Sequence, residues 1–256
     1  MIPLNYREDP GLDFLRFCNH EDLEPLVEIL AKKKGEGRWT ASLEGDKDFI
    51  RHRSNLPLAW KLIAAELQRF GADSVVSVFR LGKGVHYREI LTDVCSQMKI
   101  PIADKEAEFA AIELQLLSKV LTDSLEKMSP EEIEAFVQSL GKAADDLGLG
   151  PNPARMAPAA LAAAVRVAIG TGGFNTYRLA VIVANAVSKA VLNRGLAFAG
   201  NAALTRGIAV LAGPIGWAIS ATLTVPVVSG PAFRVTIPAA LYIAYLRQKR
   251  LNKDPL

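Results

Sequence analysis

The side chains of this chain that could do chemistry match no familiar catalytic or metal-binding spacing. His20, His52 and His86 lie far apart and show neither an HExxH motif nor the short His/Cys spacing of a zinc site. The Gly-Lys-Gly stretch at residues 82–84 lacks the spacing of a phosphate-binding loop and indicates a turn. No nucleophile-elbow sequence occurs. We therefore predict no catalytic residue, no metal site and no cofactor, and we do not expect an enzyme.

Charge is distributed unevenly along the chain. From Leu147 to Lys253 it runs for 107 residues without an aspartate or a glutamate. Residues 1–150 carry 19 lysines and arginines against 26 acidic residues, whereas residues 151–256 carry 11 against 1. Anionic lipid headgroups are the commonest surface that attracts an apolar, purely cationic segment. The asymmetry predicts two domains, an acidic one at residues 1–147 and a basic, apolar one at residues 151–256.

Cations recur in the basic part at intervals of 11 or 12 residues, which is about three helical turns. On a helix they would form a stripe opposite an apolar surface, as in helices that lie at a membrane interface. Glycines at positions 170, 172 and 173 interrupt the pattern, so we expect two helices rather than one. Two aromatic residues and a C-terminal basic cluster complete the predicted membrane or partner surface. Its members are Arg155, Arg166, Arg178, Lys189, Trp217, Tyr242, Arg247, Lys249 and Arg250.

The longest run without a charged residue covers the 27 positions 207–233. It exceeds the roughly 20 residues that span a bilayer core. Pro214 and Pro226 lie inside the run, and each would interrupt a helix. We therefore expect a broken hairpin rather than a straight transmembrane rod. Three alternatives stay open, because the hairpin could be buried in a helical bundle, could associate peripherally or by shallow insertion with a membrane, or could span it fully.

The acidic part carries many helix start and stop signals and few alternating β-branched runs. Asn19 is placed to cap a helix that begins near His20, and the sequence Ser-Pro-Glu-Glu from Ser129 is a capping box before another helix. Further helices are expected at residues 58–70, with Gly71 as the stop, at 87–98 and at 105–127, and a connection at 35–54. The predicted fold is all-α, an acidic N-terminal helical bundle followed by a Gly/Ala-rich, apolar C-terminal helical hairpin region.

The cysteines and the N-terminus indicate a compartment. Cys18 and Cys95 lie 77 residues apart on helical patterns, which suits buried thiols in a reducing environment better than a disulfide framework. The first residues lack the cationic start and apolar run of a secretory signal. We expect a cytoplasmic protein, peripheral at the inner face of the cytoplasmic membrane where it binds lipid.

Several stretches resemble one family. They are Tyr6–Pro10 with Asp13–Leu15, Asn19–Leu23, Ile63–Gly71, Tyr87–Cys95, Gly213–Trp217 and Gly230–Pro238. Together they resemble the YaaW family of uncharacterised bacterial proteins over nearly the whole chain. The resemblance implies no catalytic residue, since the family has no established activity, but it implies a relation to ubiquinol-cytochrome c chaperone-type domains.

These observations predict a non-enzymatic helical protein that associates with an anionic membrane surface or binds a hydrophobic protein client. The alternative is a chaperone or assembly factor for a respiratory-chain membrane protein, as the resemblance implies. We do not expect nucleic acid as a partner, because the cations of the basic part are diluted among apolar residues with few aromatics.

Overall fold

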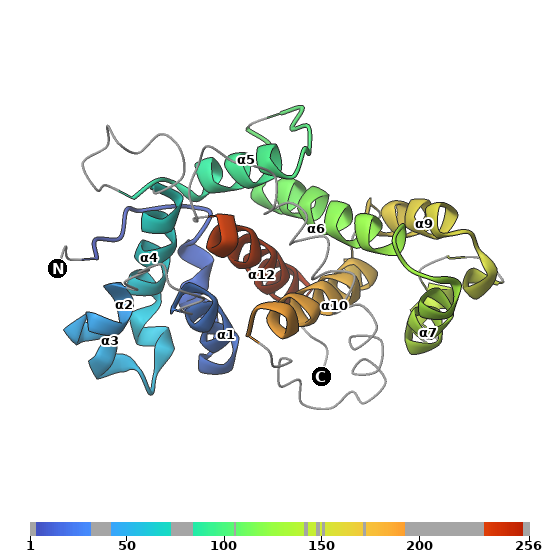
Figure 1. The fold of residues 1–256 in the computed structure, drawn as a ribbon. Coiled ribbons are helices and arrows are strands. Elements are labelled where there is room, and N and C mark those ends of the chain that lie inside the picture. The colour runs from blue at the N-terminus through green and yellow to red at the C-terminus, as the bar shows by residue number, and fades with distance from the viewer. Residues whose placement is uncertain are drawn as a thin grey trace. The chain divides into compact units, whose positions relative to one another are not determined.

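The structure is a computed structural model of the chain. It describes residues 4–31, 42–72, 84–104, 106–140, 143–146, 149, 152–170, 173–192 and 233–252. All regular structure in these ranges is helical, and Figure 1 draws it as coiled ribbons without an arrow. The predicted all-α class is confirmed.

The chain divides into two compact units. Unit 1 consists of residues 1–109 and 225–243, and unit 2 of residues 110–224 and 244–256. Helix α12 (Phe233–Leu251) supplies residues to both units. The predicted domains, 1–147 and 151–256, follow composition and charge, whereas these units follow packing. The predicted domain boundaries therefore stay a prediction.

Unit 1 begins with an extended segment, the 3-10 helix η1 (Asp13–Phe17) and helix α1 (His20–Ala31). The predicted cap of α1 is confirmed, because the Asn19 side chain accepts the N–H of Asp22 at 2.8 Å. The Asp22 carboxylate in turn accepts the N–H of Asn19 at 3.4 Å. Leucines and other apolar residues of α1 are buried at helical spacing, which fixes the face that meets the core.

Four more helices and a 3-10 helix complete the N-terminal part of unit 1. They are α2 (Ser42–Gly45), α3 (Lys47–His52), η2 (Leu56–Ala59), α4 (Trp60–Ala72) and α5 (Tyr87–Gln97). The expected connection at residues 35–54 is wrong for its described part, which contains α2 and α3. Asp46 starts α3 by accepting the N–H groups of Asp48 and Phe49 at 2.9 and 3.0 Å.

Gly71 does not stop α4, contrary to the expectation. The helix continues to Ala72, and Gly71 is buried within it. A Cβ at this position would lie 2.5 Å from Cγ1 of Ile90 and 2.7 Å from Cγ2 of Val85. The absence of a side chain therefore allows α4 to approach Ile90 of α5 and Val85 closely.

Unit 2 is built from the remaining helices. They are α6 (Phe109–Leu125, whose first residue belongs to unit 1), α7 (Pro130–Leu140), α8 (Ala143–Asp146), η4 (Pro153–Arg155), α9 (Pro158–Gly170) and α10 (Gly173–Leu192). The predicted capping box of α7 is confirmed. The Glu132 carboxylate accepts the N–H of Ser129 at 2.9 Å, and the Ser129 hydroxyl accepts the N–H of Glu132 at 3.2 Å. The predicted pair of helices around the glycines at 170–173 is also confirmed.

Three contacts join the helices of unit 2. The Thr176 hydroxyl of α10 donates to the carbonyl of Ile169 in α9 at 3.1 Å. The rings of Tyr177 and Tyr245 stack with centroids 6.3 Å apart, which places α10 against α12. Arg247 of α12 forms an ion pair with the fully buried Glu113 of α6 at 2.7 Å. These contacts anchor the C-terminal half of α12 in unit 2.

The uncharged run at residues 207–233 lies outside the described residues, apart from Phe233, the first residue of α12. The predicted broken hairpin and Trp217 therefore fall where the structure describes nothing. Among the helices that the structure describes, none is both long and apolar enough to cross a membrane.

Candidate functional site

Three of the predicted contact residues are exposed cations of unit 2. Arg155 ends η4, Arg166 lies on α9 and Lys189 lies in the last turn of α10. Within the described ranges no carboxylate pairs with any of the three. Their charges are therefore available to a negatively charged surface outside the chain.

The other predicted residues have different surroundings. Tyr242 is 1% exposed and donates its hydroxyl proton to the carbonyl of Asp22 at 3.0 Å, inside unit 1. Arg247 makes the ion pair with Glu113, and its side chain is 13% exposed. Arg178 is half-buried. Lys249 and Arg250 lie in the last turn of α12, where the helix dipole favours a positive charge. Trp217 lies outside the described residues.

Helix α9 is apolar on nearly all sides. Its inner face buries Leu161, Val165 and Ile169. Its outer face is also apolar apart from one arginine, and Val167 is 69% exposed. A helix that is apolar all round suits burial in protein or in lipid, yet half of α9 faces outward. We call this outer face the α9 surface, and it consists of Ala159, Ala160, Ala163, Arg166 and Val167.

The apolar character of α10 and α12 has a different explanation. Leu179 to Ser188 of α10 are buried without interruption, and so are Thr236 to Leu246 of α12. Two helices buried on all sides are expected to be apolar all round. Core packing therefore explains much of the apolar composition of the described C-terminal region, but it does not explain the apolar outer face of α9.

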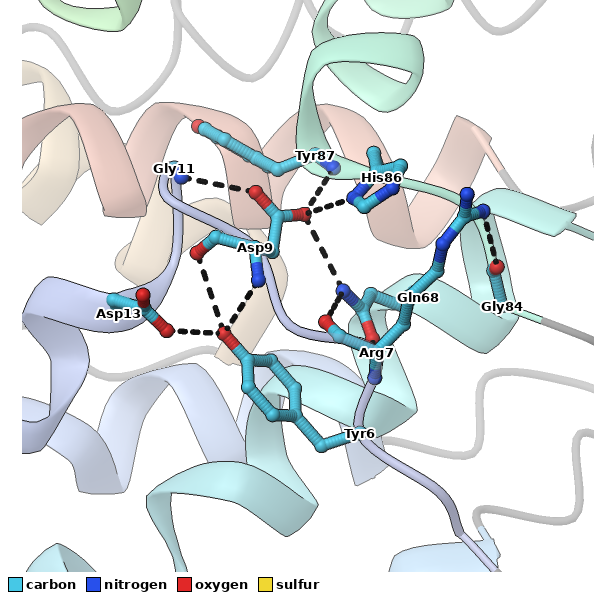
Figure 2. Close-up of polar contacts among 9 residues, drawn as sticks. All are labelled: Tyr6, Arg7, Asp9, Gly11, Asp13, Gln68, Gly84, His86 and Tyr87. Atoms are coloured by element: carbon cyan, nitrogen blue, oxygen red, sulfur yellow. Dashed lines mark hydrogen bonds and ion pairs between the residues drawn. The ribbon is translucent and has the colours of Figure 1, made fainter.

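A second cluster surrounds the buried Asp9 in unit 1 (Figure 2). Asp9 is 1% exposed, and one of its carboxylate oxygens accepts the first N–H of α5, from Tyr87, at 2.6 Å. The same oxygen accepts from the Gln68 amide at 3.3 Å, and the other accepts the N–H of Gly11 at 2.9 Å. A carboxylate at a helix N-terminus is favoured by the helix dipole. Asp9 therefore ties the extended segment to α4 and α5.

Gln68 and Tyr6 hold the same extended segment, as Figure 2 shows. The Gln68 side chain accepts the N–H of Arg7 at 3.0 Å and donates to the Arg7 carbonyl at 2.8 Å, so it binds that backbone as a neighbouring strand would. The Tyr6 hydroxyl donates to Asp13 at 2.6 Å and accepts the N–H of Asp9 at 3.2 Å. Burial and the bond to Asp13 raise the pKa of Tyr6 well above its ordinary value. We call this arrangement around Asp9 the Asp9 clamp.

A histidine completes the surroundings of Asp9. His86 occupies the N-cap position of α5 without a side-chain capping hydrogen bond, and its Nδ1 lies 3.7 Å from the Asp9 carboxylate, beyond hydrogen-bond distance. The carboxylate oxygens are already taken by N–H donors of the protein. In the part of the chain that the structure describes, no group of three or more His, Cys, Asp or Glu could hold a metal ion. The contacts of the clamp join the backbone of the extended segment to side chains and backbone of α4 and α5.

Sequence reasoning missed the Asp9 clamp, although two local signals pointed to it. Asp-Pro-Gly at residues 9–11 is a turn sequence in which an aspartate side chain often bonds the backbone two residues on, as Asp9 does with Gly11. The stretch Tyr6–Pro10 was among those that carried the family resemblance. The partners Gln68 and Tyr87 lie in two other stretches of that resemblance, but they are 59 and 78 positions away, so no local pattern joined them to Asp9.

Comparisons with known proteins show which family the chain belongs to. A UPF0174 protein of Helicobacter pylori (strain J99) is 41% identical over 252 residues, which cover 97% of this chain and 96% of that protein. The UPF0174 protein YaaW of Escherichia coli K12 is 35% identical over 255 residues, or 96% of each chain. The chain belongs to the UPF0174 family. This finding confirms the resemblance to YaaW, with relatives in bacteria.

Two further comparisons bear on the UPF0174 chain. A domain of unknown function, DUF3944, matches residues 6–39. The match includes Tyr6, Asp9, Gly11 and Asp13 of the Asp9 clamp, so the extended segment belongs to the part that this domain family describes. No solved structure matches the chain.

Proposed function

We propose that this UPF0174 protein is a non-enzymatic, cytoplasmic protein that binds reversibly to the anionic inner face of the cytoplasmic membrane through the α9 surface. One observation carries the proposal. The outer face of α9 is apolar apart from Arg166, and Val167 is 69% exposed. Such a face, which carries a cation and no acidic residue of its own, is typical of helices that lie in the headgroup region.

Charge supports the same contact. Arg155, Arg166 and Lys189 have no carboxylate partner among the described residues, and residues 147–253 contain no acidic residue. Each cation near an anionic bilayer contributes about 1 kcal/mol. Inserting Val167 adds roughly 1–2 kcal/mol. Binding of this kind is reversible and weakens as salt screens the charges.

Sedimentation with vesicles tests the proposal. Wild-type protein is expected to bind vesicles that contain phosphatidylglycerol at low salt and to stay in solution with phosphatidylcholine alone. Val167→Ser and Arg166→Glu should each weaken binding, by about tenfold for the valine and more than fivefold for the arginine. Lys127→Glu reverses an exposed cation that lies after α6 and is the matched control. Wild-type protein that ignores anionic vesicles at low salt would remove the proposal.

A chaperone or assembly factor for a respiratory-chain membrane protein is the second candidate. The small side chains Ala159, Ala160 and Ala163 would let a helix of a hydrophobic client approach α9 closely. Co-purification from detergent extracts separates the two candidates. Recovery of one defined membrane protein with wild type and not with Val167→Ser, without binding to lipid vesicles, would favour the chaperone.

A further inference from the structure

We infer that unit 1 carries a second surface that binds the anionic bilayer, separate in its residues from the α9 surface. This inference rests on the proposed membrane association. We call the region the unit 1 surface. It consists of the apolar residues Phe17, Ile50 and Leu58 and the cations Arg16, Arg53 and Lys61.

The apolar residues come from three short elements that pack together. Helix η2 packs against both η1 and α3. Each of the three elements buries one large residue and leaves another exposed. Phe17 of η1 is 55% exposed, Ile50 of α3 is 59% exposed and Leu58 of η2 is 63% exposed. Three large apolar side chains therefore face outward from neighbouring elements of the same unit.

The cations of the unit 1 surface lie over aromatic rings instead of beside carboxylates. The Arg16 guanidinium lies 4.6 Å from the centroid of the Phe17 ring. The Arg53 guanidinium lies 5.7 Å from the Phe49 ring, and the Lys61 ammonium lies 5.7 Å from the Trp60 ring. An aromatic face holds a cation in place without neutralising its charge. Among the described residues, no acidic side chain pairs with these three cations.

Three other cations of the described structure are paired with carboxylates. Arg69 is paired with Glu66, Arg51 with Asp48 and Lys119 with Asp123. Residues 49–65 also contain no aspartate or glutamate, although the first 150 residues are acidic overall. The elements that carry the unit 1 surface also contain Asp13 and Asp48, but Asp13 accepts a hydrogen bond from Tyr6 and Asp48 pairs with Arg51. The three cations of the surface therefore attract an anion from outside.

A lipid surface fits this arrangement because it meets both kinds of side chain at once. Exposed side chains such as Phe17 and Leu58 can enter the boundary between headgroups and acyl chains, while long cationic side chains reach the phosphates. The short elements that carry them need no deep insertion. The occupant that we infer is thus a bilayer containing anionic phospholipid.

Vesicle binding by the full-length protein provides the test. Arg53→Glu with Lys61→Glu should weaken binding to phosphatidylglycerol-containing vesicles by at least roughly 25-fold, at about fivefold for each cation lost. Ile50→Ser with Leu58→Ser should also weaken binding, and this pair leaves the charge unchanged. All four positions are exposed, so circular dichroism is expected to show an unchanged fold. Lys127→Glu is again the control.

A fluorescent probe at position 58 gives a local readout. Leu58→Cys can be labelled selectively, because Cys18 and Cys95 are buried. Emission of an environment-sensitive label should shift to the blue with anionic vesicles and stay unchanged with phosphatidylcholine. A shift caused by soluble polyglutamate and not by vesicles would overturn the inference in favour of an acidic protein partner.

The outcomes separate the inference from the proposed function. Loss of binding in the unit 1 variants, with α9 variants unaffected, supports the inference and removes the proposed role of α9. Loss in the α9 variants alone overturns the inference and leaves the proposed function standing. Loss in both sets supports both surfaces.

Discussion

Asp9 shows how one buried carboxylate can organise backbone that forms no regular structure. It accepts hydrogen bonds from Gly11, Gln68 and Tyr87, which belong to the turn, α4 and α5. A buried charge is tolerated when hydrogen bonds replace its hydration. Because the donors are N–H groups, a negatively charged, acceptor-only side chain is the one that suits the position.

Replacing Asp9 by asparagine should therefore destabilise the protein. Asp9→Asn removes the charge at the start of α5 and turns an amide group toward N–H donors, which should lower the free energy of unfolding by about 2–4 kcal/mol. Urea denaturation followed by circular dichroism measures this. Glu8→Gln changes the exposed neighbouring carboxylate and should have little effect. Equal stabilities of the two variants would contradict the role assigned to Asp9.

The buried Cys95 thiol should lower the stability of the folded protein at alkaline pH. Burial raises the pKa of the Cys95 thiol from 9.0 to about 11. A raised pKa means that the folded state favours the neutral thiol, so its stabilising contribution is full below pH 9 and disappears as the pH rises toward about 11. Denaturation midpoints measured across this window should fall for the wild type. Cys95→Ala should show a shallower fall, and an identical slope would count against the assignment.

At the scale of elements, the helix starts were predictable and one helix end was not. Asn19 and Ser129 cap their helices through bonds that span three residues, so the sequence carries the whole signal. Gly71 has the residue type of a helix stop, but packing against Ile90 decides its role. That contact joins positions 19 residues apart, which a local pattern cannot record.

Gly71→Ala tests this role of close packing. Alanine is the better helix former, yet its Cβ would lie within 2.5–2.8 Å of Ile90 and Val85 atoms. Overpacking of this kind should lower the free energy of unfolding by about 1–3 kcal/mol. Gly170→Ala is the matched variant, since its Cβ would meet no atom within 4 Å, and its stability should change by less than about 1 kcal/mol. Thermal unfolding of both variants measures these changes in stability. A Gly71→Ala protein more stable than wild type would refute the packing argument.

At the scale of the whole molecule, charge and packing divide the chain differently. The acid-free stretch indicated one basic domain, whereas α12 packs its first half into unit 1 and its second half into unit 2. Tyr242 illustrates the cause. Its ring was expected at a membrane interface, but its hydroxyl binds the carbonyl of Asp22, 220 positions earlier in the chain. The exposed α9 surface, in contrast, depends on the sequence of one helix, and Arg166 was predicted from it.

The shared helix α12 predicts that both units depend on the C-terminal part of the chain. A protein that ends before Phe233 loses the core residues Ile237 and Tyr242 from unit 1, and Tyr245 and Leu246 from unit 2. Large buried side chains contribute several kcal/mol each, so neither unit should keep its native stability. Hydrogen exchange should then show loss of protection in α4 of unit 1 and in α10 of unit 2.

A protein that ends at Asn252 retains α12 and should exchange as the full chain does, which makes it the control for truncation itself. If α4 kept its protection in the shorter protein while α10 lost it, unit 1 would fold without α12. The bond between Tyr242 and Asp22 would then be a peripheral contact, and the basic C-terminal part would be closer to the separate domain that its charge predicts.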